Sequence, residues 1–250
     1  MQSSKKNFKF TIEYLGTHYR GWQFQPNCQT IQGEIEKALK KILHKDLQDI
    51  NLIGSGRTDS GVHALGQVAN VIINTRMSAI NLKNAINSNV RDDIFIKESL
   101  EVDLNFNSRF SAKRRSYIYK ICKNKSPFID DREWFNSGNF NQDLLMECSN
   151  LILGENDFSS FSKNNPDIKN KLCAIYLSEW NFFENNLIYQ IEGNRFLHHM
   201  VRYLVGTMIE VSQSKISLDD FRKLLNNQSN RLNIFKAPAH GLYLNKVCYD

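Results

Sequence analysis

The sequence has no long apolar run, and this absence excludes a class of protein. A membrane-spanning helix needs about 18–20 consecutive apolar residues, and no stretch of the chain approaches that length. The first residues run from two lysines, Lys5 and Lys6, straight into an alternating pattern, without the apolar region and small-residue cleavage site of a secretion signal. We therefore expect neither a membrane protein nor an exported one, and we expect a cytoplasmic location.

Cysteine is scarce and scattered, and no Cys-x-x-Cys pair occurs. An odd number of separated cysteines fits reduced thiols in the cytosol better than a disulfide framework or a zinc site. We therefore expect free thiols and no metal. The five cysteines are Cys28, Cys122, Cys148, Cys173 and Cys248.

The composition is that of a folded protein with a slight excess of basic residues. At 41% hydrophobic and 23% charged residues, the chain is neither disordered, collagen-like nor a coiled coil. A chain of 250 residues buries roughly 70–75% of its unfolded surface without a metal or disulfide. The 32 basic and 26 acidic residues give a net charge of +6, which is compatible with a polyanionic partner.

Periodicity predicts an α+β fold. Residues 8–14 alternate as a half-buried strand does, and Thr30 reads as the N-cap of an amphipathic helix. The predicted order is approximately β-α-β-β-α-β, loosely repeated in the second half, which suggests two ferredoxin-like (RRM-like) halves. The predicted strands are residues 8–14, 68–73, 94–102, 116–122, 173–183, 186–192 and 241–249, with a further short strand before the loop at residue 54. The predicted helices are residues 31–43, 78–87, 141–153 and 196–211. A last helix begins at a capping box, Ser217 to Asp220.

The most unusual segment is Gly54–Val68, which places four glycines, an arginine and an aspartate between two strands. Glycines allow the backbone to approach a ligand closely, but neither pattern of a phosphate-binding loop is present. One interpretation is a surface loop with a local ion pair between Arg57 and Asp59. Another starts from Asp59-Ser60-Gly61, which imitates the triplet of aspartic proteases. That chemistry needs two carboxylates sharing a proton, and Arg57 works against such sharing.

A second constellation is the basic segment, Arg109–Lys125, which contains no acidic residue. Tyr117 and Tyr119 share one face of its predicted strand with Arg115. Cations bind phosphates and aromatic rings stack on bases, so the pattern is typical of a nucleic-acid-binding surface. The alternative interpretation is a solvated edge strand with its tyrosines in the core. Its seven cationic residues are Arg109, Lys113, Arg114, Arg115, Lys120, Lys123 and Lys125.

The apolar stripe of residues 196–211 predicts a core helix with Arg202 on its flank, one turn beyond His198. An arginine there either extends along the surface to solvent or reaches a carboxylate in a cleft. His198 and His199 are neighbours, so on a helix they point about 100° apart and cannot chelate one metal.

Six groups of residues occur in an order that resembles the tRNA pseudouridine synthase A family over about residues 10–249. The Arg-Thr-Asp-x-Gly-Val-His group is specific by itself. The six are Tyr14-x-Gly16-Thr17 with Gly21-Trp22-Gln23-x-Gln25; Gly56 to His63 with Gly66-Gln67-Val68; Arg109-Phe110-Ser111-Ala112 with Arg115-x-Tyr117-x-Tyr119; Leu153 to Phe158 with Phe161; Phe196 to Arg202 with Val205-Gly206; and Gly241 to Leu244.

The resemblance implies two ferredoxin-like halves, residues 1–105 with the catalytic loop and residues 106–250, whose antiparallel sheets join across a central basic cleft. It also implies a homodimer that needs no metal or organic cofactor. The implied reaction converts uridines 38, 39 and 40 in the anticodon stem-loop of tRNA to pseudouridine.

By position, the resemblance makes Asp59 the catalytic aspartate and Tyr117 the tyrosine beside the uracil. Arg57 matches the arginine that helps displace the target nucleotide, Arg202 the basic partner of the aspartate, and Leu242 an apolar wall of the pocket. The competing hypotheses are a non-catalytic RNA-binding module and a dimeric aspartic protease. For the RNA backbone, the basic segment offers Arg109, Lys113, Arg114, Arg115 and Lys123.

Overall fold

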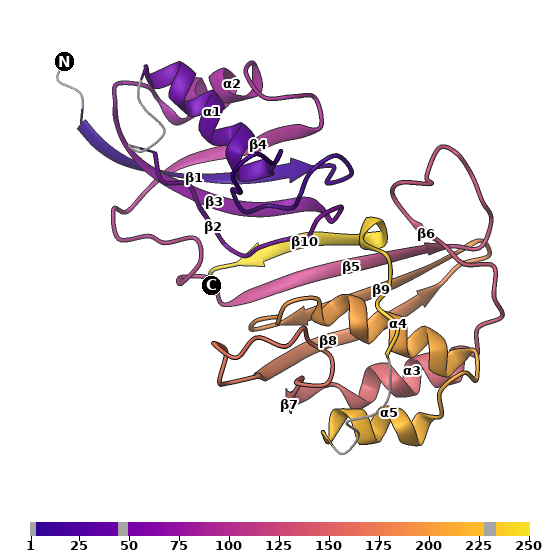
Figure 1. Cartoon of the computed structure of the whole chain (residues 1–250). Coiled ribbons are helices and arrows are strands. Elements are labelled where there is room, and N and C mark those ends of the chain that lie inside the picture. Colours follow the sequence, from indigo (N-terminus) through magenta and orange to yellow (C-terminus); the bar gives the residue numbers. More distant parts are fainter. Residues whose placement is uncertain (1–3, 45–49, 228–233) are drawn as a thin grey trace. The chain divides into compact units, whose positions relative to one another are not determined.

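A computed structural model describes residues 4–44, 50–227 and 234–250, and in it the chain forms two compact units (Figure 1). Unit 1 consists of residues 1–113 and 244–250, and unit 2 of residues 114–243. The last residues of the chain thus return to the first unit. The division into functional halves at residue 105 stays a prediction. Among the described residues, none of the helices has the length and apolarity to cross a membrane.

The core of unit 1 is an antiparallel sheet in which β1 (Ser4–Tyr14) lies between β4 (Ile94–Val102) and β3 (His63–Thr75). The short strand β2 (Ile53–Gly54) also pairs with β3, and β10 (Leu242–Cys248) is its neighbour on the sheet path. From Phe8 to Tyr14, every second side chain of β1 is buried, as its alternating sequence predicts.

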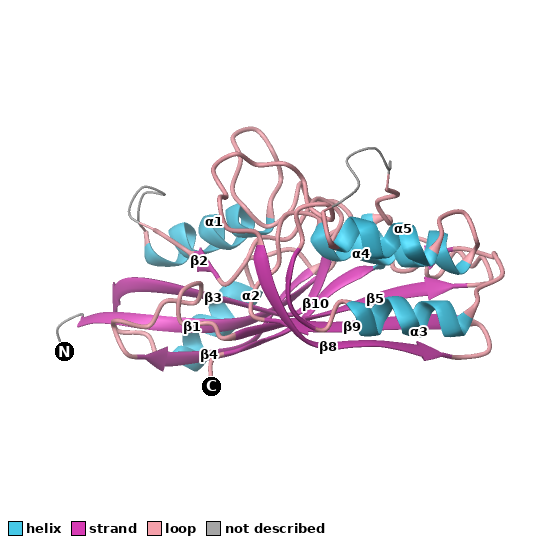
Figure 2. Ribbon diagram, turned by 90° about the horizontal axis from the view of Figure 1, so that it is seen from below, coloured by secondary structure: helices cyan, strands magenta, loops and turns pink. Residues whose placement is uncertain are grey.

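Two helices bury apolar residues in unit 1. Helix α1 (Ile31–Leu43) begins at Thr30, whose hydroxyl accepts a hydrogen bond from the Gly33 amide at 3.2 Å, so the predicted cap is confirmed. Helix α2 (Ala79–Asn87) begins at Ser78 in the same way. Figure 2 shows α1 beside the strands of this unit.

In unit 2, four antiparallel strands follow one another in the order β5 (Arg114–Cys122), β9 (Asn186–Gly193), β8 (Leu172–Phe182) and β7 (Gly154–Asp157). The two-residue strand β6 (Trp134–Phe135) pairs with β5 in parallel. The three long strands were predicted from their patterns. The short strands β6 and β7 were not, because they are too short to show a period.

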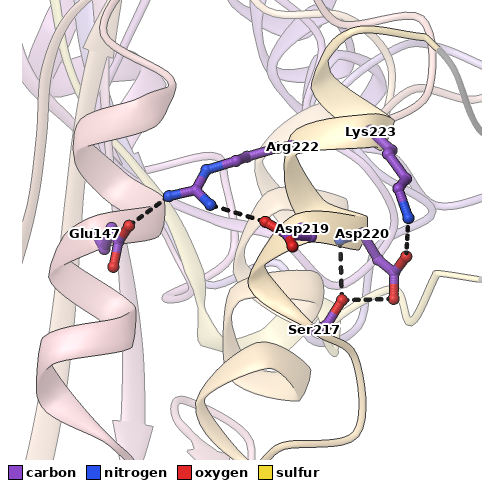
Figure 3. A network of polar contacts seen from close by, with 6 residues as sticks. All are labelled: Glu147, Ser217, Asp219, Asp220, Arg222 and Lys223. Carbon is purple, nitrogen blue, oxygen red and sulfur yellow. Dashed lines mark hydrogen bonds and ion pairs between the residues drawn. The ribbon is translucent and has the colours of Figure 1, made fainter.

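Three helices, α3 (Gln142–Leu151), α4 (Met200–Ser212) and α5 (Leu218–Leu225), gather beside the strands of unit 2 (Figure 1). Figure 3 shows how α5 is held: Arg222 bridges Asp219 on its own helix at 2.9 Å and Glu147 on α3 at 2.6 Å. The predicted cap of α5 is present, because the Ser217 hydroxyl accepts from the Asp220 amide at 3.1 Å.

The predicted start of the second of these helices, α4, was wrong. Helix α4 begins at Met200, not at residue 196, because its N-cap His199 adopts a left-handed backbone (φ 66°) and ends the turn that precedes the helix. His198 and His199 are therefore outside the helix, and their ring centroids lie 3.8 Å apart. The expected angle of about 100° between them, which assumed a helix, therefore does not apply. The objection to a shared metal rested on that angle and does not apply either.

Candidate active site

Asp59 lies in unit 1 on the loop between β2 and β3, residues 55–62, which we call the Asp59 loop. Two hydrogen bonds fix its backbone to the segment that follows β1. The Trp22 amide donates to the Thr58 carbonyl at 3.1 Å, and the Ser60 hydroxyl donates to the Tyr19 carbonyl at 3.1 Å. Asp59 is thus held on both sides by residues whose backbone is tied to another part of the unit.

Buried side chains strengthen this attachment. The hydroxyls of Tyr14 and Thr58 are 2.7 Å apart, and His63 Nδ1 accepts a hydrogen bond from the Gly16 amide at 3.0 Å. His63 is completely buried, so it supports the loop rather than meeting a substrate. The first two sequence groups of the family resemblance, which begin at Tyr14 and at Gly56, are therefore joined by these hydrogen bonds around the Asp59 loop.

Glycine is required where the two segments touch. Gly21 has φ +92°, and a Cβ there would lie 2.5 Å from the Thr58 carbonyl oxygen. A Cβ on Gly16 would collide with the Val62 carbonyl. Both backbones can approach the Asp59 loop because neither residue has a side chain.

The other end of the loop is held by β3. The Ser55 amide donates to the Val68 carbonyl and the Ser55 hydroxyl to Gln67 Oε1, both at 2.7 Å. The Gln67 side-chain amide then donates to the Gly56 carbonyl at 3.0 Å. The loop is fixed at both ends, and it presents a half-buried aspartate whose position the chain cannot easily change.

The local ion pair considered between Arg57 and Asp59 stays a prediction. The expectation assumed an extended chain, in which residues two apart share a side. Residues 57–59 are not in a strand, and Arg57 is exposed whereas Thr58 is buried.

Tyr117 and Tyr119 lie on β5 in unit 2 and differ in their surroundings. The Tyr117 ring is 9% exposed and meets Phe196 edge to face, with centroids 5.1 Å apart. Tyr119 is fully buried, its hydroxyl donates to the Pro238 carbonyl at 2.7 Å, and burial raises its pKa well above 10.0. Tyr119 is therefore a core residue and not a base-stacking one.

Arg202 is 9% exposed, so it does not extend into solvent along the helix surface. Its Nε donates to the Ala237 carbonyl at 2.8 Å, and the Ala237 amide donates to the Arg202 carbonyl at 3.1 Å. A Cβ on Gly206 would collide with the Phe235 carbonyl. This glycine lets the segment around Ala237 lie directly against α4 and fix the arginine.

Leu242 begins β10 and is 5% exposed. It follows the short 3₁₀ helix η2 (Ala239–Gly241), where a Cβ on Gly241 would lie 2.7 Å from the Tyr119 ring. The core tyrosine of β5 thus positions the start of β10, which explains why a glycine precedes Leu242.

The basic segment has acidic and carbonyl partners that its own sequence does not contain. Arg114 pairs with Glu192 on β9 at 3.0 Å, and Arg115 donates to the Asn194 carbonyl at 2.9 Å. Lys123 donates to the Glu184 carbonyl at 3.1 Å. Although the segment itself contains no acidic residue, Arg114 is paired, because the neighbouring strand supplies a carboxylate. Lys113 is exposed.

The sequence comparisons identify the family. The family model described as "tRNA pseudouridine synthase" matches residues 11–111 and 149–250. The tRNA pseudouridine synthase A of Hydrogenobaculum sp. is 42% identical over 249 residues, 98% of this chain and all of that protein, and that of Thermosipho melanesiensis is 40% identical over 248 residues, again 98% of this chain and all of that protein. This chain belongs to the tRNA pseudouridine synthase family.

As a member of the pseudouridine synthase family the chain is an isomerase with a mixed α+β, mostly antiparallel fold, as predicted. This decides against the dimeric aspartic protease and the non-catalytic binding module. Among solved structures, a Cbf5-Nop10-Gar1 complex aligns over 81% of this chain and 44% of that chain, with a TM-score of 0.37 and 11% identity, a likeness too distant to support a conclusion.

In this pseudouridine synthase, the candidate residues are divided between the units. Asp59 and Arg57 belong to unit 1, and Tyr117, Arg202 and Leu242 belong to unit 2. Sequence reasoning missed the residues that hold the Asp59 loop. Their signal was available, since buried polar residues inside a specific motif need hydrogen-bond partners. These supporting residues are Tyr14, Thr58, His63 and Gln67.

Proposed function

We propose that this protein converts uridine to pseudouridine at positions 38, 39 and 40 of tRNA, with Asp59 as its catalytic residue. The observation that carries the assignment is the Asp59 loop, in which one carboxylate is held by backbone and side-chain hydrogen bonds at both ends. The full-length likeness to proteins named tRNA pseudouridine synthase A supports the substrate.

The reaction is an isomerisation, so the product has the same composition as uridine. The N1–C1′ bond of uridine breaks, the uracil rotates in place, C5 bonds to C1′, and the proton on C5 leaves while N1 gains one. An ionised Asp59 has three routes in this sequence: attack on C1′, addition to C6 of the ring, or removal of the C2′ proton. Each route needs one carboxylate, unlike glycosidases, which use two to bring in water.

The other assignments concern access and orientation. A uridine in a stem must leave its base pair, which costs a few kcal/mol, and the exposed Arg57 is suited to take its place. We assign Tyr117 and Leu242 to the walls around the uracil. Arg202 is the basic partner that keeps Asp59 charged at neutral pH.

Two further parts of this proposal concern the protein's surroundings. We expect a homodimer, which sedimentation equilibrium of the purified chain measures. We also expect a cytoplasmic enzyme. We expect it to need no added cofactor, and an activity assay after dialysis against a chelator tests this.

Tritium release from tRNA labelled at C5 of uridine tests the catalytic role, because the C5 hydrogen leaves only when C5 bonds to C1′. We expect Asp59→Asn and Asp59→Ala to lose all measurable release while tRNA binding stays within a few-fold of wild type. Loss of a nucleophile or base costs many orders of magnitude. Turnover within about tenfold of wild type would remove Asp59 from the mechanism.

The position assignment needs its own substrates. Three tRNA transcripts, each with uridine at only one of positions 38, 39 and 40, separate the sites. Release from all three supports the proposal, and release from none of them, with release from another uridine, refutes it.

A further inference from the structure

We propose that Phe110 is a stacking platform for an unpaired base of the RNA substrate other than the target uridine. This inference rests on the proposed function for its substrate class. Phe110 is 79% exposed although it belongs to a large apolar residue type. An isolated apolar residue on a surface is ordinary, so the argument depends on how this ring is held and what surrounds it.

The ring projects from a rigid turn, residues 107–111, which we call the Phe110 turn. The Asn107 side-chain oxygen accepts from the amides of Arg109 and Phe110 at 3.0 and 3.1 Å. The Ser111 amide donates to the Asn107 carbonyl at 2.9 Å, and the Asn107 amide donates to the Ser111 hydroxyl at 3.3 Å. A ring on such a turn loses little conformational entropy when a partner binds.

A buried amide network anchors this turn to the sheet of unit 1. Asn7 and Asn70 are at most 1% exposed, and the Asn70 amide donates to the Asn7 side-chain oxygen at 3.0 Å. Asn7 also donates to the Phe106 carbonyl at 2.9 Å, and the Ser108 amide donates to Asn70 Oδ1 at 2.8 Å. Two buried amides thus fix the backbone on the N-terminal side of Phe110.

The same network ties the Phe110 turn to β2, the strand that leads into the Asp59 loop. The Ser108 hydroxyl donates to the carbonyl of Ile53, the first residue of β2. That strand ends at Gly54, and the Asp59 loop begins at the next residue. The Phe110 turn and the Asp59 loop are therefore both attached to β2, and we infer that one bound RNA stem-loop contacts both.

The charge around Phe110 selects a nucleic acid over a protein partner. The Arg109 guanidinium carbon lies 5.5 Å from the Phe110 centroid, within the range of a cation–π contact. The ring belongs to the basic segment, which contains no acidic residue. Phe128 is equally exposed, at 85%, but it precedes Asp130 and Asp131, which repel phosphates. Phe128 is thus the matched control.

Binding of the full-length protein to unmodified tRNA tests the platform. Stacking on an aromatic ring contributes ~1–3 kcal/mol per base, so we expect Phe110→Ala to raise Kd about 5- to 150-fold. Phe110→Tyr and Phe110→Trp should stay within a few-fold of wild type. Phe128→Ala should not change Kd. Phe110→Leu retaining the affinity of Phe110→Tyr would overturn the proposal, because apolar bulk rather than a ring would then suffice.

The base is located with 2-aminopurine placed at single unpaired positions of the anticodon loop. Stacking quenches its fluorescence, so wild type should quench one position more than Phe110→Ala does. Equal quenching at every position would overturn the proposal. So would a Kd change that follows dissociation of a dimer by sedimentation, which would make Phe110 a contact with a second copy of this chain.

The outcome is separable from that of the proposed function. If wild type releases no tritium from tRNA but binding still depends on the Phe110 ring, the platform stands and the reaction assignment fails. If tritium is released normally and the ring has no effect on Kd or quenching, the reaction stands and the platform fails.

Discussion

At the residue scale, Tyr117 is the candidate whose ring and hydroxyl can be tested separately. Its ring packs on Phe196 and is 9% exposed, and we propose that the exposed part of the ring contacts the base. We expect Tyr117→Phe to keep much more tritium release than Tyr117→Ala, whose loss should be about 5- to 150-fold. Equal losses in the two variants would show that the hydroxyl matters as much as the ring. Thermal unfolding of both variants controls for lost packing.

Individual residues also show what the sequence could and could not predict. The assignment of Asp59 came from a motif, whereas the inward position of Tyr119 depends on the carbonyl of Pro238, a residue far along the chain. The sequence around Arg114 contains no acidic residue, but the arginine pairs with Glu192, which is distant in sequence and adjacent in space. Periodicity indicates which face of an element a residue occupies, but it does not indicate which residue from elsewhere in the chain contacts it there.

At the element scale, the Asp59 loop depends on the glycine beside it. Gly21→Ala places a side chain on a backbone with φ +92° and about 2.5 Å from the Thr58 oxygen. Strained backbone of this kind costs ~1–3 kcal/mol, so the loop should shift. We expect single-turnover conversion at saturating tRNA to fall more than about tenfold, while tRNA Kd changes little.

Gly56 provides the matched control for Gly21. Nothing lies within 4 Å of a Cβ built there, and its φ is not in the left-handed region. Gly56→Ala should keep the thermal unfolding midpoint of wild type, whereas Gly21→Ala should lower it. A Gly21→Ala variant with wild-type stability and single-turnover rate would show that the attachment to Thr58 does not position the loop.

A second element-scale prediction concerns Glu36 on α1. Burial is the largest effect on this carboxyl and raises its pKa above 4.5, against hydrogen bonds from Gln32 and the Leu52 amide that lower it. The folded state therefore binds more protons than the unfolded state above pH 4.5, and stability falls as pH rises through that window. A glutamine keeps an acceptor oxygen without the charge.

We therefore expect Glu36→Gln to unfold at a higher urea concentration than wild type at pH 7.5. The advantage should shrink toward pH 4, where the glutamate of wild type is protonated in both states. A difference that is constant across this range, or a less stable variant at pH 7.5, would contradict the assignment of the effect to the charge.

The start of α4 shows why element boundaries were predicted less well than elements. The apolar stripe of residues 196–211 is real, but a stripe does not distinguish a helix from the turn that leads into it. The left-handed backbone of His199 decides the boundary, and a histidine carries no sequence signal for that conformation comparable to that of glycine. In contrast, the helix starts at Thr30 and Ser217 were predicted from the sequence, because a cap is a local interaction between the hydroxyl and an amide three residues later.

At the scale of the whole molecule, the basic segment makes a prediction about salt. Each phosphate that a protein cation neutralises releases counterions, and the slope of log affinity against log salt changes by about 0.7–0.9 for each contact. If this segment meets the RNA backbone, the triple variant Lys113→Ala, Arg114→Ala, Lys123→Ala should have a flatter slope and weaker tRNA binding. Its single-turnover rate at saturating RNA should stay nearly intact.

The ion pair of Arg114 with Glu192, at 3.0 Å, sharpens this prediction. Glu192→Gln frees the guanidinium for phosphate, so it should tighten binding, and the gain should vanish when Arg114 is also changed to alanine. A charge-matched control variant removes three cations that lie outside the basic segment and pair with carboxylates, namely Lys37, Arg91 and Lys223. It should leave the slope of log affinity against log salt unchanged.

Arg57 and Arg202 should behave in the opposite way from the basic segment. They are assigned to displacing the nucleotide and to keeping Asp59 charged, so their replacement should slow the chemical step even when RNA saturates the enzyme. Parallel salt titrations of the two sets of variants, with single-turnover rates at saturation, distinguish backbone contacts from catalytic ones. A slope unchanged in the Lys113, Arg114 and Lys123 triple variant would place the RNA backbone on another face of the protein.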